Sequence, residues 1–85
     1  MAPDLAVVIL SPSDNAPAII DKTADYLDAG TRLLWVVEPH RRSITEYRSR
    51  NEIRLLEAGD ALRGYDVLPG FSVTVADVFA DPLGS

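Results

Sequence analysis

The stretch that decides the fold is residues 5–37, which read LAVVILSPSDNAPAIIDKTADYLDAGTRLLWVV. Residues 5–10 form a continuous apolar run rich in β-branched side chains, which predicts a strand covered on both faces. Residues 33–37 predict a second buried strand. Between them, residues 18–29 carry apolar side chains at helical spacing, at Ile19, Ile20, Thr23, Ala24 and Leu27. Two buried strands joined by a helix make a βαβ unit with parallel strands.

Short polar segments mark both ends of this helix. Residues 11–15, Ser-Pro-Ser-Asp-Asn, break the first strand and offer side-chain oxygens to the free N–H groups of the first helical turn. We expect Ser11, Ser13 and Asp14 to act as caps and not as nucleophiles, because no histidine is positioned to activate a serine. Gly30 suits the left-handed residue that ends a helix.

The rest of the chain predicts a hairpin and a short closing helix. Residues 43–48 alternate between two faces, with Ile44, Glu46 and Arg48 on one of them, and residues 52–57 can pair with them across residues 49–51. Residues 71–75 predict a short strand or extended segment. Residues 75–80 predict one helical turn that brings Val78 and Phe79 onto the core, followed by a frayed tail. The expected fold is α/β with a mixed sheet, in a single domain over residues 1–85.

Composition excludes several classes of site. The chain of 85 residues contains no cysteine, so disulfides and thiolate zinc sites are excluded. Its one histidine, His40, is expected in an exposed turn. No apolar run is long enough to cross a bilayer and no basic stretch precedes residues 5–10, so we expect a cytoplasmic protein without a membrane partner. A net charge of −5 argues against strong non-specific DNA binding.

Several motifs occur in a characteristic order. They are Pro3-Asp4-Leu5, Leu10-Ser11-Pro12-Ser13-Asp14, Lys22, Tyr26, Gly30, Trp35-Val36-Val37 and Leu68-Pro69-Gly70-Phe71. In this order they resemble the C-terminal half of the Uma-two family of restriction endonucleases, which are of the PD-(D/E)xK type. The resemblance implies a restriction-endonuclease-like fold, here as a truncated domain.

The resemblance also implies a metal-dependent phosphodiesterase. In such a site, acidic side chains hold Mg²⁺ against the scissile phosphate, and a lysine orients water or offsets the developing charge. The family pattern places one metal-binding aspartate on a strand upstream of this segment. It places a glutamate at the position of Val8 and a lysine at the position of Lys22. Asp4 is the acid that remains near the implied metal site.

Val8 is the departure that decides the functional expectation. Valine has no oxygen to offer a cation, whereas Mg²⁺ requires near-octahedral oxygen coordination. We therefore expect this chain alone to be catalytically inactive, a pseudoenzyme without a bound cofactor. For Asp4, a turn role at the strand entrance is favoured over metal binding. Lys22 could also simply pair with a neighbouring aspartate of its own helix.

Three partner hypotheses remain open. A sheet without upstream strands should leave an unpaired edge, which favours a homo-oligomer, expected as a two-fold dimer, that acts as an interaction module. Alternatively, another polypeptide supplies the missing half in trans. A third hypothesis is DNA binding without cleavage. Its only support is the group of arginines around the predicted hairpin, which are Arg41, Arg42, Arg48, Arg50 and Arg54. A solvated surface is the simpler interpretation of these arginines.

Overall fold

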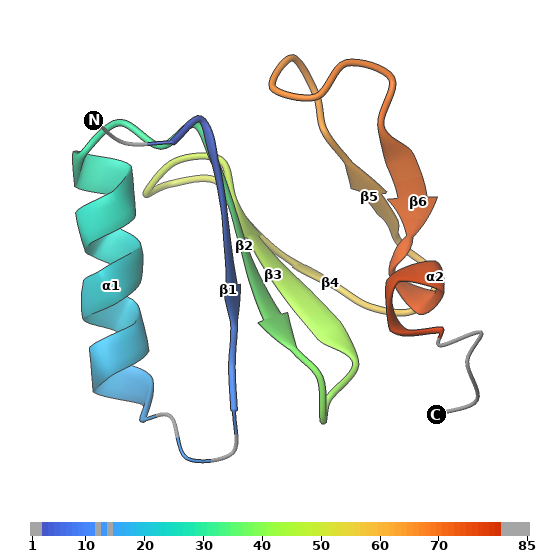
Figure 1. The fold of residues 1–85 in the computed structure, drawn as a ribbon, viewed down its shortest axis with the longest axis horizontal. Helices are drawn as coiled ribbons and strands as arrows, with labels where there is room; N and C mark the ends of the chain where they lie inside the picture. Colours follow the sequence, from blue (N-terminus) through green and yellow to red (C-terminus); the bar gives the residue numbers. More distant parts are fainter. Residues whose placement is uncertain (1–2, 12, 14, 81–85) are drawn as a thin grey trace.

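A four-stranded mixed sheet lies between one long helix and a small second layer in the computed structural model (Figure 1). The structure describes residues 3–11, 13 and 15–80. The elements in chain order are β1 (Leu5–Ile9), α1 (Ala16–Asp28), β2 (Leu33–Glu38), β3 (Ser43–Tyr47), β4 (Ile53–Leu56), β5 (Ala61–Arg63), β6 (Ser72–Thr74) and α2 (Val75–Phe79).

The sheet has the strand order β1-β2-β3-β4. Strands β1 and β2 are parallel and are joined by α1, which confirms the predicted βαβ unit. Strands β3 and β4 run antiparallel as the predicted hairpin, with Tyr47 opposite Ile53. Strands β5 and β6 form a separate two-stranded ribbon. In the described part of the chain, no helix is long and apolar enough to cross a membrane.

The ends of α1 follow from local chemistry. The side chain of Asn15 accepts a hydrogen bond from the N–H of Ala18 at 2.9 Å, so Asn15 caps the helix. The hydroxyl groups of Ser11 and Ser13 lie 3.0 Å apart and bond each other. Pro12 and Asp14 lie outside the described residues. Gly30 has a φ of +106° and ends the helix as predicted.

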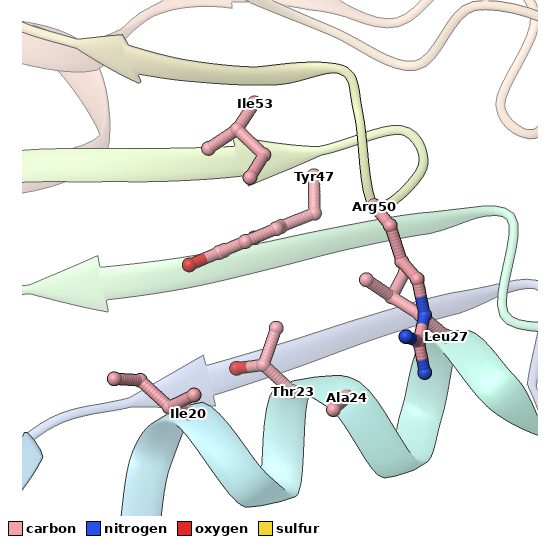
Figure 2. A pocket seen from close by; sticks show the side chains of 7 residues that line it. All are labelled: Ile20, Thr23, Ala24, Leu27, Tyr47, Arg50 and Ile53. Carbon is pink, nitrogen blue, oxygen red and sulfur yellow. The ribbon is translucent and has the colours of Figure 1, made fainter. Parts of the chain in front are cut away.

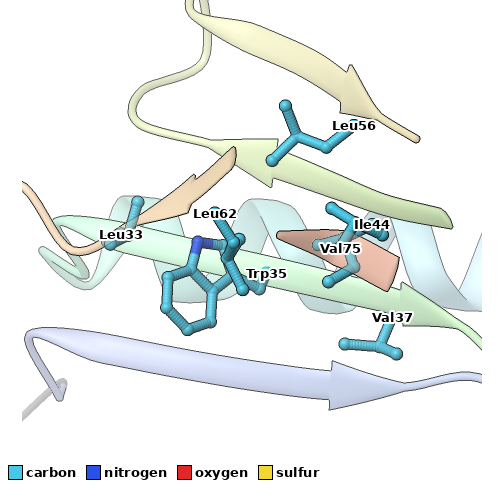
Figure 3. Packing of buried hydrophobic residues seen from close by; sticks show 7 residues of the cluster. All are labelled: Leu33, Trp35, Val37, Ile44, Leu56, Leu62 and Val75. Atoms are coloured by element: carbon cyan, nitrogen blue, oxygen red, sulfur yellow. The ribbon is translucent and has the colours of Figure 1, made fainter. Parts of the chain in front are cut away.

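The two faces of the sheet carry two separate apolar clusters. One face packs under the β5–β6 ribbon and α2, through Leu33, Trp35, Val37, Ile44, Leu56, Leu62 and Val75 (Figure 3). The other packs under α1, through Ala6, Val8, Leu34 and Val36, with Ile19 and Tyr26 of the helix against them. Strand β2 contributes to both clusters and is buried along its whole apolar length, as the sequence predicts.

The structure corrects four details of the sequence analysis. Strand β1 is not covered on both faces, because Val7 is 50% and Ile9 67% exposed. Ile20 is 65% exposed, so the covered face of α1 is narrower than predicted. Val78 points away from the core, where Val75 is fully buried instead. Strand β5 was not predicted, because three residues between two turn signals are too few to show alternation. The predicted frayed tail, residues 81–85, lies outside the described residues.

Candidate functional site

Asp4 lies at the entrance of β1 and acts there through its backbone. Its carbonyl oxygen accepts hydrogen bonds from the N–H groups of Arg32 at 3.1 Å and Leu33 at 3.0 Å. These bonds hold the start of β2 against the start of β1. The carboxylate of Asp4 is exposed to solvent.

Val8 faces α1 from the middle of β1 and is only 8% exposed. It belongs to a cluster with Ala6, Leu34 and Val36, the last two of which are 0% and 3% exposed. Partly buried side chains from the helix close the cluster from above. The position implied for an acidic metal ligand is therefore filled by a valine in a closely packed apolar environment.

Lys22 lies on the exposed side of α1. It forms no ion pair with any acid in the described part of the chain, including Asp21 and Asp25 of its own helix. The structure thus places Asp4 at the strand entrance, Val8 in the interior and Lys22 on the helix surface.

The residues present do not fit a magnesium ion. Within residues 3–11, 13 and 15–80, no three histidine, cysteine, aspartate or glutamate side chains converge as a metal site would require. A magnesium site normally uses one or two carboxylates together with water and substrate phosphate. Here Val8 offers no oxygen, and Asp4 belongs to no group of three such side chains among the described residues. We therefore derive no catalytic step through a metal.

One cavity beside the helix is apolar and lies away from these residues. It has a volume of about 300 Å³ and opens between α1 and the β3–β4 hairpin (Figure 2). Its lining residues are Ile20, Thr23, Ala24, Leu27, Tyr47, Arg50 and Ile53. Neither Asp4, Val8 nor Lys22 lines it, so the cavity does not rebuild the site that the resemblance implies.

The arginine-rich hairpin is largely neutralised by acids. Arg50 pairs with Asp28 at the end of α1. Weaker contacts join Arg48 to Glu52 at 3.7 Å and Arg41 to Glu38 at 3.8 Å. Of the five hairpin arginines, only Arg42 and Arg54 form no ion pair with the described acids. Few cations are thus left to contact a phosphate backbone.

A buried carboxylate, Glu46, is the polar feature that sequence reasoning did not single out. Glu46 is 1% exposed and accepts hydrogen bonds from Trp35 Nε1 at 3.3 Å and Tyr65 Oη at 2.9 Å. Burial raises the pKa of Tyr65, and its hydrogen bond to Glu46 raises that pKa further. The Arg48 guanidinium lies 3.9 Å from the centre of the same ring. The alternation in residues 43–48 placed Glu46 on the same face as Ile44, and this placement was the sequence signal for the burial of Glu46.

The Glu46 network holds the second layer to the sheet. Its two donors come from β2 and from the loop after β5, so both carboxylate oxygens are engaged by donors. Buried polar groups that are satisfied in this way rigidify a fold. We assign the network a structural role, because a carboxylate that already accepts from two side chains has little capacity for a ligand.

Comparisons with known proteins agree with this fold. Residues 1–76 match the model of the Uma2 (Uma-two) family, described as a putative restriction endonuclease. A crystal structure of a putative nuclease belonging to DUF820 from Anabaena variabilis is similar, with a TM-score of 0.83 and 22% sequence identity. The alignment covers 93% of this chain and 45% of that chain, so the present chain spans less than half of its neighbour. Comparison with the curated proteins gave no match.

Proposed function

The chain belongs to the Uma2 family, and from this premise we propose that it is a catalytically silent member of a restriction endonuclease family. An active relative would hydrolyse a DNA phosphodiester bond with the help of a divalent cation. In this proposal the present chain keeps the scaffold of such an enzyme and does not cleave DNA by itself.

The observation that carries the proposal is the environment of Val8. A ligand for Mg²⁺ needs an oxygen, and a rotamer change cannot supply one to a valine side chain. The neighbours of Val8 in its cluster, Ala6, Leu34 and Val36, are also apolar and buried. Lys22 remains on the helix surface and has no metal-bound phosphate to act on.

The test is a cleavage assay with purified protein. Supercoiled and linear DNA are incubated with Mg²⁺ or Mn²⁺, with the wild-type chain, the Lys22→Ala variant and a sample containing a chelator. We expect no cleavage above the buffer control in any of them. Cleavage that needs the cation, follows the protein peak through chromatography and disappears in Lys22→Ala would overturn the proposal.

A second proposed role is assembly, in which the chain acts as a non-enzymatic module or as a half-domain completed in trans. The open edge of β1 supports this role, since an unpaired strand readily adds a strand from another chain. Sedimentation of the purified chain tests it. A protein that remains monomeric alone and also in a lysate of its source would contradict both forms of the role.

A DNA-binding role without cleavage has weaker support. Three of the five hairpin arginines already pair with acids, and the whole chain carries a charge of −5. Binding through phosphate contacts strengthens as salt is lowered. We therefore expect no electrophoretic shift of duplex DNA by micromolar protein even at low salt. A shift that weakens steeply with added salt would instead favour this role.

A further inference from the structure

Strand β1 presents an open edge whose unpaired backbone groups can be assigned. The sheet ends at β1, which pairs only with β2 among the described strands. The carbonyl of Asp4 and the N–H of Leu10 both bond to β2 or to its entrance. Because alternate residues of a strand direct their backbone groups to opposite sides, Leu5, Val7 and Ile9 direct theirs away from β2.

Two of these residues, Val7 and Ile9, form an exposed apolar stripe. Leu5, Val7 and Ile9 share the sheet face of the Trp35 cluster, as their register with Leu33, Trp35 and Val37 requires. The β5–β6 ribbon and α2 cover that cluster but leave Val7 50% and Ile9 67% exposed. The open hydrogen-bonding edge and exposed apolar side chains therefore coincide on one strand.

This edge also lacks the features by which proteins block strand addition. Within Leu5–Ile9, whose sequence is LAVVI, there is no charge, proline or glycine. The opposite edge, β4, contains Arg54 and is followed by Glu57. Of the two edge strands of this sheet, β1 is the one that contains no charged residue.

We propose that a second copy of this chain pairs with β1 in antiparallel orientation about a two-fold axis at Val7. This inference rests on the assembly role proposed above and identifies its surface and its partner. The pairing sets Leu5 opposite Ile9 of the second copy and forms roughly six backbone hydrogen bonds. Two four-stranded sheets become one continuous sheet, and the exposed Val7 and Ile9 side chains of both copies meet on one face.

The charges around the edge suit a two-fold arrangement. In this register Asp4 lies opposite Leu10 of the second copy, so the two Asp4 carboxylates are six residues, about 20 Å, apart. One flank of α1 faces the cavity above β3 and β4. The opposite flank faces the β1 edge. Helical spacing places Lys22 and Asp25 on this flank, both exposed. The two-fold operation turns this flank, which carries both a cation and an anion, toward the same flank of the second copy.

The experiment is analytical ultracentrifugation of the 85-residue chain with three variants. We expect the wild type to sediment at twice the monomer mass of 9.3 kDa. Val7→Pro removes only an N–H that points away from β2, so the variant should fold and sediment as a monomer. Val7→Lys places a charge at the axis and should also be monomeric. The matched control is Ile53→Lys, which changes a similarly exposed residue on the opposite edge and should remain dimeric.

Hydrogen exchange on the wild type provides a readout that needs no variant. In the proposed dimer the amides of Leu5, Val7 and Ile9 are protected, and dilution below the dissociation constant removes the protection. A monomeric wild type in which these three amides exchange freely would overturn the proposal. So would a dimer that survives in folded Val7→Pro and Val7→Lys. The cleavage assay tests a separate proposal. A dimer that cleaves DNA would refute only the proposed lack of activity, and an inactive monomer would refute only the proposed dimer.

Discussion

Replacing Val8 with glutamate introduces the acid that the resemblance implies at this position of β1, and the structure predicts that the introduced acid destabilises the fold. The new side chain would enter a cluster whose members Leu34 and Val36 are 0% and 3% exposed. Burying an unpaired carboxylate costs on the order of several kcal/mol even after relaxation. A domain of this length has a total stability of about 4–13 kcal/mol. At neutral pH, Val8→Glu should therefore lose a large share of its stability.

The loss should depend on pH in a defined direction. Burial disfavours the charged form, so the pKa of the introduced carboxyl is higher in the folded than in the unfolded state. The folded protein then holds the proton more tightly than the unfolded chain. The loss of stability relative to the wild type should therefore be smallest below a pH of about 4, which is near the ordinary pKa of glutamate. The deficit should grow as pH rises toward the raised folded pKa. Val8→Gln has a similar shape without the charge and should lack this pH dependence.

The assay is urea denaturation of both variants over a pH series, with and without Mg²⁺. The midpoint of Val8→Glu should fall relative to Val8→Gln as pH rises, and Mg²⁺ should not restore it. The reasoning is refuted if Val8→Glu is as stable as the wild type at neutral pH and Mg²⁺ stabilises it beyond the glutamine control. That result would mean that the surroundings of residue 8 accept a metal ligand.

Three further predictions concern the second layer. Gly64→Ala should lower the free energy of unfolding by about 1–3 kcal/mol, because the added Cβ would lie 2.4 Å from a backbone oxygen; Gly59→Ala, with nothing within 4 Å, is the control and should be near neutral. Glu46→Ala should lower the free energy of unfolding by about 2 kcal/mol, because it leaves the indole and phenol donors without an acceptor. Glu46→Gln should lower it less, and equal losses of stability in chemical denaturation would contradict this expectation. The raised pKa of Tyr65 predicts that stability falls as pH rises above about 10, since the folded state then holds more protons. Tyr65→Phe should flatten this fall, and an unchanged slope in alkaline titration would exclude the phenol as its source.

Local sequence patterns were sufficient for the main elements. The two apolar runs, the helical spacing between them and Gly30 predicted the βαβ unit, because each signal depends on neighbours a few residues apart. Alternation in residues 43–48 likewise predicted the hairpin and the burial of Ile44. Motif order predicted the family, which the match over residues 1–76 confirms. The sequence also showed that Val8 offers no oxygen where the resemblance implies an acidic ligand.

Contacts between distant residues could not be predicted in the same way. Glu46 reaches donors 11 and 19 residues away, and Arg50 pairs with an acid 22 residues before it. No local pattern specifies such partners, since they depend on how layers stack. The sequence accordingly indicated a basic hairpin, whereas the fold places acids beside three of its five arginines.

The covering of β1 shows the same division between sequence and tertiary structure. The apolar run at residues 5–10 specified a strand, and its composition indicated burial on both faces. Whether a face is buried depends on how far the neighbouring layer extends sideways, and here the β5–β6 ribbon and α2 stop short of β1. By itself the sequence determined the strand, the helix and the lack of a side-chain oxygen at residue 8. Only the tertiary structure decided that Val7 and Ile9 remain exposed, because burial is a property of packed layers and not of the strand that they cover.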